Sequence, residues 1–498
     1  MNVNPITRLD YPDPDVIRVE DTYYMVSTTM HFMPGCEILQ SFDLVHWEHV
    51  TYVYETLDHT DAQQLKSGQN IYGQGMWAAS LRYHEGRFYI CFVANDTRKT
   101  YLYTSEKIDG PWKKQLIEGF YHDGSLLFDE DGRNYIVYGN DEIWITELNE
   151  DLTAPKKDGL HRLLVSDHKN PELGYEGSHI QKINGYYYIF LIHSLRDRWM
   201  RTEACFYSDS LEGEFTGGDV LCDDRGYCGQ GVAQGGIVDT PDGKWYAMLF
   251  QDSGAVGRIP ILLPVTWKDH FPFFGQNRHV PEEIEVHSTR PGYIYQPLVG
   301  SDDFCNGLLP RWQFNHDPDP RYYHLDALQG TYTITTREVC TELTQAVNTL
   351  TQRMSYPSCA AEVTVDASAL KEGDVAGLCA LQSCYAAVGI TKHHGKYEVL
   401  MLDKKEDGIL DMTEGTVVES HQMDFRLEAD FCNMKDEARC YYRVNKGDWL
   451  PIGTVHKLYF KLDHFTGCRF GLFCYAAEET GGSACFRDFK YYDVDEIS

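Results

Sequence analysis

The sequence predicts an all-β protein: a five-bladed β-propeller followed by a β-sandwich of jelly-roll or concanavalin-like type. One hairpin pattern recurs five times in the first half of the chain, and the second half changes to short alternating strands without helical periodicity. We expect a propeller domain over residues 1–300, which includes a wrapping linker at 269–300, and a sandwich domain over residues 301–498.

The recurring pattern is an apolar strand, a turn with Gly or Asp, and an aromatic-rich strand that carries a marker Tyr. Asp-Gly and Asn-Gly, which occur in several copies, are strong signals for a hairpin turn. The copies span residues 14–27, 79–93, 124–139, 178–192 and 236–250, with the marker Tyr at 24, 89, 135, 188 and 246. The spacing of the markers leaves room for about four strands per repeat, which is the size of a propeller blade.

The repeat ends near Trp267, and a segment of different composition follows. The segment 269–300 is rich in Pro, Gly and His, contains no comparable hairpin, and carries aromatic residues that need a surface to bury against. We therefore expect a linker that wraps one domain onto the other. Beyond it, stretches such as 331–335, 361–365 and 397–401 alternate in polarity and predict the strands of an antiparallel sandwich.

The composition excludes several classes of partner. A formal net charge of −31 repels phosphate backbones and anionic membrane surfaces, so we expect neither nucleic acid nor membrane as a partner. The chain has no long apolar run, no signal-peptide pattern at its N-terminus, and no Cys-x-x-Cys pair among its 15 Cys, which predicts a cytoplasmic protein with reduced thiols. An oligosaccharide is the expected partner, because the 34 Tyr supply rings that stack on sugars, although Tyr also favours β-strands.

Three acidic residues share one position of the repeat. Counting back about 12 residues from each marker Tyr reaches the entry of that blade's first strand. The five entry residues are Asp13, Trp77, Asp123, Glu176 and Gln234. Blade entries converge on one mouth of the propeller axis, so we expect these side chains to lie together. A single acid before a strand commonly only caps a turn, but surface acids have no reason to recur in one register.

Such a set of acids is suited to the hydrolysis of a glycosidic bond. Two carboxyl groups must flank the bond, one to protonate the leaving oxygen and the other to activate water or attack carbon. A third carboxylate beside the proton donor would raise the pKa of that donor and keep it protonated near neutral pH. No other His, Asp and Glu grouping has metal-ligand spacing, so we predict no metal site, and His122 and His179 are expected to hydrogen-bond to the acids.

At these residues the chain resembles glycoside hydrolase family 43, over essentially the whole propeller. The resemblance rests on Pro12-Asp13-Pro14, His122-Asp123-Gly124-Ser125, Glu176-Gly177-Ser178-His179 and Gly257-Arg258-Ile259-Pro260. It implies that Asp13 is the general base, Asp123 the pKa modulator and Glu176 the general acid of an inverting enzyme. It also implies that Arg258 bonds sugar hydroxyls in the first subsite, and the segment 312–320 resembles the entry to the family's sandwich domain.

Two positions depart from the pattern of that family. Ser178 stands where many members have Pro, which leaves the acid in place but changes how its loop is held. Gln234 stands where many members have a His near an axial calcium or its water shell, so a structural calcium stays undecided and no cofactor is expected to be required. The candidate substrate-binding residues are Arg258, Trp77, Phe32, Tyr175 and Gln234.

The resemblance implies an exo-acting enzyme that releases a terminal pentose, β-D-xylose or α-L-arabinofuranose, from plant hemicellulose oligosaccharides. We expect the sandwich to dock on the propeller and close one side of the pocket, so that only chain ends or side branches enter. Two alternatives stay open: a retaining fructosidase-type propeller hydrolase, whose motifs are replaced here, and a carbohydrate-binding propeller without activity. The sequence decides neither the preferred sugar and linkage nor whether the protein forms a homo-oligomer.

Overall fold

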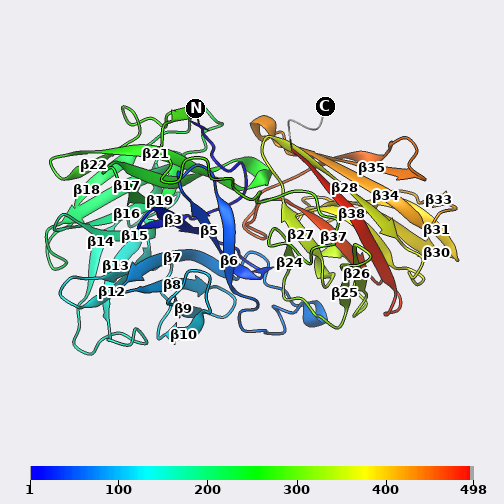
Figure 1. The fold of residues 1–498 in the computed structure, drawn as a ribbon, viewed down its shortest axis with the longest axis horizontal. Helices are drawn as coiled ribbons and strands as arrows, with labels where there is room; N and C mark the ends of the chain where they lie inside the picture. Colours follow the sequence, from blue (N-terminus) through cyan, green and yellow to red (C-terminus); the bar gives the residue numbers. More distant parts are fainter. Residues whose placement is uncertain (1, 494–498) are drawn as a thin grey trace.

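The protein is built almost entirely of β-strands, as a computed structural model of residues 2–493 shows. Residue 1 and residues 494–498, the outermost parts of the two expected domains, lie outside the described residues. Within the described range, five four-stranded sheets form one half of the molecule and two larger sheets form the other half (Figure 1). The predicted fold class, a five-bladed propeller followed by a sandwich, is confirmed. No helix in this range is long and apolar enough to span a membrane.

Each blade of the propeller consists of four antiparallel strands. Blade one contains β2 (Asp15–Val19), β3 (Thr22–Val26), β5 (Gly35–Ser41) and β6 (Glu48–Tyr54), and blade two contains β7 (Met76–His84), β8 (Arg87–Ala94), β9 (Lys99–Ser105) and β10 (Lys113–Ile117). Blade three contains β11 (Ser125–Phe128), β12 (Asn134–Asn140), β13 (Glu142–Leu148) and β14 (His161–Ser166). Blade four contains β15 (Glu176–Ile183), β16 (Tyr186–Ser194), β17 (Arg201–Ser208) and β18 (Thr216–Leu221).

Blade five contains β19 (Val232–Asp239), β20 (Trp245–Asp252), β21 (Arg258–Lys268) and β22 (Phe271–Phe274). All five predicted hairpins form the first two strands of a blade. The first strands of successive blades contact one another and close the ring around the axis.

The segment expected to be only a linker, 269–300, also contributes a strand to the propeller. Strand β22 pairs with β21 across a turn at Asp269 and His270, and Phe274 is fully buried in blade five. The following β23 (Glu283–Ile284) pairs with β1 (Asn2–Val3). Further along, the side chain of Tyr293 and the backbone N–H of Gln296 donate hydrogen bonds to Glu48 of blade one. The segment therefore completes one blade and crosses another before it reaches the sandwich.

The sandwich consists of two antiparallel sheets that bury one continuous core between them. One sheet has the order β32 (Leu410–Met412), β31 (Lys396–Lys404), β30 (Ala386–His393), β29 (Val375–Leu381), β37 (Arg469–Tyr475), β27 (Leu350–Arg353), β24 (Gln313–Asn315) and β4 (Phe32–Met33), with β33 (Thr416–Val418) beside β31. The other has the order β25 (Tyr323–Asp326), β26 (Thr331–Thr335), β38 (Ser483–Asp493), β28 (Ser358–Asp366), β34 (Gln422–Asp430), β35 (Glu437–Val444) and β36 (Leu450–Lys457).

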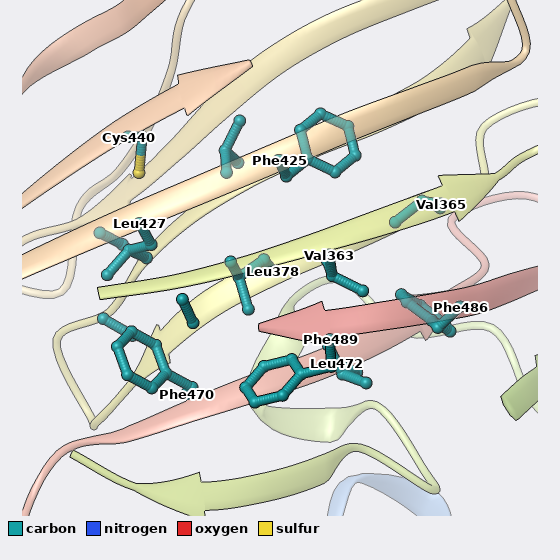
Figure 2. Packing of buried hydrophobic residues seen from close by; sticks show 14 of the residues in the cluster. Val363, Val365, Leu378, Phe425, Leu427, Cys440, Phe470, Leu472, Phe486 and Phe489 are labelled. Carbon is teal, nitrogen blue, oxygen red and sulfur yellow. The ribbon is translucent and has the colours of Figure 1, made fainter. Parts of the chain in front are cut away.

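Apolar side chains from both sheets meet in this core. Val363, Leu378, Phe425 and Phe470 come from four different strands and lie together between the sheets (Figure 2). The alternation predicted for 331–335 is present, since Tyr332 and Ile334 are buried and the three Thr of that strand are partly exposed.

The two domains share an interface that is part of both cores. Strand β4, which belongs to the propeller segment of the chain, pairs with β24 and thereby extends a sandwich sheet across the domain boundary. Ala255, Val256 and Ile259 of the propeller lie in the same hydrophobic cluster as the sandwich core. The buried carboxylate of Asp10 accepts one hydrogen bond from the N–H of Arg258 (2.7 Å) and another from the N–H of Gly467 (2.8 Å). Such an interface holds the domains in one fixed arrangement.

Three buried histidine rings gather in this interface. His31 from the propeller and His316 and His464 from the sandwich lie around Tyr72, with ring centroids between 4.6 and 5.1 Å apart. Both ring nitrogens of His31 and of His464 are buried without a hydrogen-bond partner among the described residues. Burial lowers the pKa of all three rings, that of His464 to about 3, because the charged form loses its water.

We expect the free energy of unfolding to fall as the pH drops from about 6.5 towards about 3. The three rings stay neutral in the folded state, whereas in the unfolded chain they take up protons near their ordinary pKa, so acid favours unfolding. Each ring contributes up to about 1.4 kcal/mol per pH unit within this window. Denaturant titrations between pH 4 and 7 should show a shallower pH dependence for His464→Gln than for the wild type.

A matched control for this experiment is His287→Gln, since 67% of the His287 side chain is exposed. That variant should keep the pH dependence of the wild type. If His464→Gln kept it as well, His464 would not be a source of the acid sensitivity.

Candidate active site

The five blade entries share an unusual backbone conformation. One residue at each entry has a left-handed φ, which is strained for any residue with a Cβ and tends to occur at functional sites. These residues are Asp13 (φ 52°), Ala78 (33°), Asp123 (48°), Gly177 (64°) and Gln234 (60°). In blades two, four and five the pairing of the first two strands also shifts register at this point. This repeated kink is the local structure that turns the entry side chains onto the axis.

Asp13 lies buried at the mouth of the axis with a charge partner. Its Oδ1 is 3.1 Å from Nη1 of Arg258, and its Oδ2 accepts a 2.6 Å hydrogen bond from the hydroxyl of Thr28. The Thr28 hydroxyl in turn accepts a hydrogen bond from the N–H of Ala78 (2.8 Å), which connects blades one and two. A carboxylate that faces a guanidinium and a hydroxyl donor is well placed to accept a proton from water.

Asp123 and Glu176 lie on neighbouring blades, and His122 lies between them. Nε2 of His122 is 3.6 Å from Oδ2 of Asp123 and 3.5 Å from Oε2 of Glu176. Oδ2 of Asp123 accepts a hydrogen bond from the N–H of Gly177 (3.1 Å), and Oε2 of Glu176 accepts one from the amide of Asn140 (2.7 Å). Asp123 is buried, whereas 18% of the Glu176 side chain is exposed, so Glu176 is the acid that an incoming molecule reaches.

These groups perturb one another's protonation. The charge of Asp123, aided by Glu176, raises the pKa of His122 to about 9 against the lowering effect of burial. Burial raises the pKa of Asp123, and the negative charges of Glu176 and Asp13 raise it further, while His122 opposes them. At neutral pH the imidazolium of His122 therefore faces both carboxyl groups. Such mutual shifts are typical of sites that carry out acid and base chemistry.

Donor atoms of His122, Asp123 and Glu176 all lie within 4.8 Å of one another, a geometry that a metal ion could use. A metal bound there would have to displace the proton that the raised pKa of His122 favours. The expected absence of a metal site stays a prediction.

Below the acids, Asp15, Arg82 and His179 form a polar cluster on the axis, which we call the axial plug. Oδ2 of Asp15 accepts from Nη1 of Arg82 (2.8 Å), and its Oδ1 lies 3.1 Å from Nδ1 of His179. Arg82 also donates to the hydroxyl of Ser125 (2.7 Å), so it ties blade two to blades one and three. A calcium ion does not fit this set, because both Asp15 oxygens are already engaged and Arg82 supplies the positive charge.

The sandwich contributes a residue to the mouth of the propeller. The ring of Phe465, from the loop between β36 and β37, lies 5.3 Å from the ring of Trp77 and 4.2 Å from the guanidinium of Arg258. The Phe465 carbonyl oxygen is also 3.4 Å from Nη2 of Arg258. Trp77 and Arg258, two predicted substrate-binding residues, thus lie between the acids and a wall formed by the second domain.

The other three predicted substrate-binding residues have different positions. Gln234 lies at the axis, where its side chain is so close to Gly177 that a Cβ on that glycine would come within 2.7 Å of it. Tyr175 packs against His193 and Phe206 inside blade four.

The ring of Phe32, the last of these candidates, lies in the domain interface. Its ring is 1% exposed and lies 3.4 Å from the guanidinium of Arg469, among residues of the sandwich. The reason is the pairing of β4 with β24, which turns this side chain into the domain interface.

Sequence reasoning missed Thr28, Asn140 and Phe465. Thr28 and Asn140 follow the marker Tyr of blades one and three by a few residues, at the point where the second strand returns to the mouth, so the repeat carried a signal for them. Phe465 carries no such signal, because its loop reaches the site only through the docking of the two domains.

The propeller gathers three carboxyl groups at one mouth of its axis. Such groups can hydrolyse a glycosidic bond. The chain belongs to glycosyl hydrolases family 43, whose model matches residues 3–272. A second model, described as the beta xylosidase C-terminal concanavalin A-like domain, matches residues 301–492. The protein is therefore a glycoside hydrolase.

Individual relatives agree with this assignment. A beta-xylosidase of Formosa agariphila is 26% identical over 99% of this chain and 89% of that protein. A non-reducing end alpha-L-arabinofuranosidase of Bacteroides ovatus is 24% identical over 82% of this chain and 79% of that protein. The structure of a bifunctional GH43-CE protein of Bacteroides eggerthii superimposes with a TM-score of 0.93 at 42% identity; the match covers 100% of this chain but 64% of that protein.

Proposed function

We propose that this glycoside hydrolase is of the xylosidase or arabinofuranosidase type and removes single terminal pentoses from plant hemicellulose oligosaccharides. The observation that supports it best is the wall that Phe465 of the sandwich builds beside Trp77 and Arg258, because a pocket blocked on one side admits chain ends and side branches only. The names of the two relatives, one for xylose and one for arabinofuranose, support a pentose as the sugar.

In the proposed mechanism Asp13 takes a proton from water while Glu176 protonates the leaving oxygen. The partners of the two groups suit these roles: Asp13 faces the guanidinium of Arg258, and the more exposed Glu176 is held by the amide of Asn140. The chain's own residues hold every acid and base role, so the mechanism requires no cofactor. Water can attack the face opposite to the leaving group if the two carboxyl groups are roughly 6.5–9.5 Å apart, which gives inversion.

Inversion at the anomeric carbon is the first expected result. During hydrolysis of nitrophenyl β-D-xyloside, proton NMR should detect the α-anomer of xylose first, and mutarotation should then produce the β-anomer. A parallel assay with nitrophenyl α-L-arabinofuranoside decides the preferred sugar. If the β-anomer of xylose accumulated first, the reaction would proceed with retention, and Asp13 would act as a nucleophile.

The variant Asp123→Asn is expected to slow turnover, most strongly at alkaline pH. Without the negative charge of Asp123 the neighbouring proton donor ionises more easily, and a carboxylate cannot donate the proton. The alkaline limb of the kcat/KM profile should therefore move to lower pH by about one unit, which is a tenfold loss on that limb.

The control is Asp131→Asn on the same blade, whose carboxyl is 44% exposed and pairs with Arg133. It should keep the pH profile of the wild type. If Asp123→Asn also kept the pH profile of the wild type, Asp123 would have no role in the mechanism.

A further inference from the structure

The propeller axis has a second opening, at the end opposite to the acids. A cavity of about 450 Å³ lies there, lined by residues of all five innermost strands. We call it the axial cavity and define it by Arg18, Tyr83, Phe128, Gln181 and Trp245. Its volume lies within the range of about 300–1,000 Å³ that is usual for small-molecule sites.

The axial cavity is separate from the acids. Along blade one the chain passes from Asp13 at the mouth through Asp15 to Ile17, and along β15 it passes from Glu176 through His179 to Gln181. The axial plug lies between these ends and is held by ion pairs and hydrogen bonds to three blades. A molecule in the cavity therefore occupies a different site from a substrate at the mouth.

Aromatic side chains remain exposed around this cavity. Tyr83 is 45% exposed, and Phe128 and Trp245 are partly exposed. The ring of Phe128 is covered by the rings of His84 (centroids 4.7 Å apart, 7° between the planes) and Tyr89 (4.5 Å). The ring surface left for a ligand therefore belongs to Tyr83 and Trp245. Partly exposed rings in a concave surface provide the flat apolar faces on which sugar rings stack.

The charged residues of the cavity wall are already neutralised. The guanidinium of Arg18 pairs with Asp239 at 2.5 Å, and the ammonium of Lys182 pairs with Asp129 at 2.6 Å. Arg82 at the base of the cavity pairs with Asp15. In a chain of net charge −31 the cavity thus offers hydrogen-bonding groups without excess positive charge. These features favour a neutral polyhydroxyl ligand over an anion such as phosphate.

We propose that the axial cavity is a second, non-catalytic carbohydrate site that binds a neutral pentose oligosaccharide. The kind of sugar rests on the proposed function, whereas the site itself rests on the cavity, its exposed rings and its neutralised charges. An oligosaccharide bound there would hold a segment of the same polymer on the side of the propeller away from hydrolysis. The site gives the protein a second point of attachment to branched substrate.

The test is isothermal titration with xylotetraose and, in parallel, arabinotetraose. The full-length Glu176→Gln variant serves as the background because it should consume the sugar about 10²–10⁴-fold more slowly than the wild type. We expect two binding sites per chain for at least one of the sugars. In the double variant Glu176→Gln, Tyr83→Ala, one site should weaken about tenfold or more, the scale of losing one stacked ring, and the other should keep its affinity.

Two further variants serve as a negative and a positive control. Tyr293→Ala removes a tyrosine that is 40% exposed on blade one, away from the cavity, and should leave both sites intact. His84→Ala, which removes the ring that stacks on Phe128, should also weaken the cavity site. A single site for both sugars, or two sites that are insensitive to Tyr83 and His84, would overturn the proposal, as would Tyr83-dependent binding of inorganic phosphate.

Failure of the cavity site is distinguishable from failure of the proposed function. Hydrolysis of nitrophenyl pentosides by the wild type tests the function alone, and Tyr83→Ala should leave that rate unchanged. If the enzyme is active but binds only one oligosaccharide, the proposed sugar site in the axial cavity is contradicted and the proposed function is not. If an oligosaccharide binds in a way that depends on Tyr83 but pentosides are not hydrolysed, the sugar site in the cavity is supported and the proposed function is contradicted.

Discussion

Replacing Glu176 with Gln is expected to lower kcat/KM on xylo-oligosaccharides by about 10²–10⁴-fold, the usual contribution of a general acid. Gln has the shape of Glu but no acidic proton to donate, so the leaving sugar must depart as an alkoxide. Glu176 is 18% exposed, and Asn140 and His122 contact one of its two carboxyl oxygens, so the replacement by an amide of the same shape disturbs little structure. Substrate binding and the melting temperature should stay close to those of the wild type.

A series of leaving groups separates this role from a general loss of activity. Dinitrophenolate is a stable anion that leaves a dinitrophenyl pentoside without protonation, so Glu176→Gln should hydrolyse this substrate far better than it hydrolyses xylobiose. Asp13→Asn is the matched comparison, because loss of the base should slow both substrates alike. If the two variants lost activity equally across the series, the assignment of acid and base would be wrong.

Removal of the sandwich is expected to abolish activity, even on a nitrophenyl pentoside that needs no polymer binding. A chain of residues 1–300 leaves β4 without β24 and exposes Ala255, Val256 and Ile259, which are now buried in a shared core. It also removes the ring of Phe465 from Arg258. We expect this fragment to aggregate or to retain less than about 1% of the wild-type kcat/KM, since exposed apolar surface of this kind drives association.

A point variant distinguishes a failure to fold from the loss of the pocket wall that Phe465 forms. Phe465→Ala in the full-length chain should fold with nearly the wild-type melting temperature, because the Phe465 ring is only partly buried, yet it should raise KM by removing one side of the pocket. A soluble and fully active 1–300 fragment would show that the sandwich is an independent module.

The sequence was sufficient to predict the features that repeat. Each hairpin is a local structure set by an alternating strand and a turn, and five copies with one spacing restrict the architecture to a ring. The same register indicated Asp13, Asp123 and Glu176, and the structure brings them to one mouth. Strand β22 escaped prediction because a fourth strand far from the axis has no partner on its outer side and carries no repeat signal.

Features that depend on contacts between the domains could not be predicted. Phe32 lies between β3 and β5 of blade one in sequence, but its pairing with Asn315, far along the chain, decides which way the ring faces. Phe465 is likewise a mouth residue only because Asp10 holds the backbone of Gly467 beside it. A single sequence shows local periodicity, whereas such pairings are set by the packing of the whole molecule.

The double role of Asp10 has a consequence for how a cell makes this enzyme. Gly467, one of the two residues whose N–H groups donate to Asp10, is synthesised 457 residues after it. At about 5–20 residues per second, the propeller sequence is complete on the order of ten seconds or more before this partner emerges. A nascent or prematurely terminated chain that ends before Gly467 therefore has all its acids but not the finished pocket, and we expect no activity until the segment with Phe465 and Gly467 has emerged.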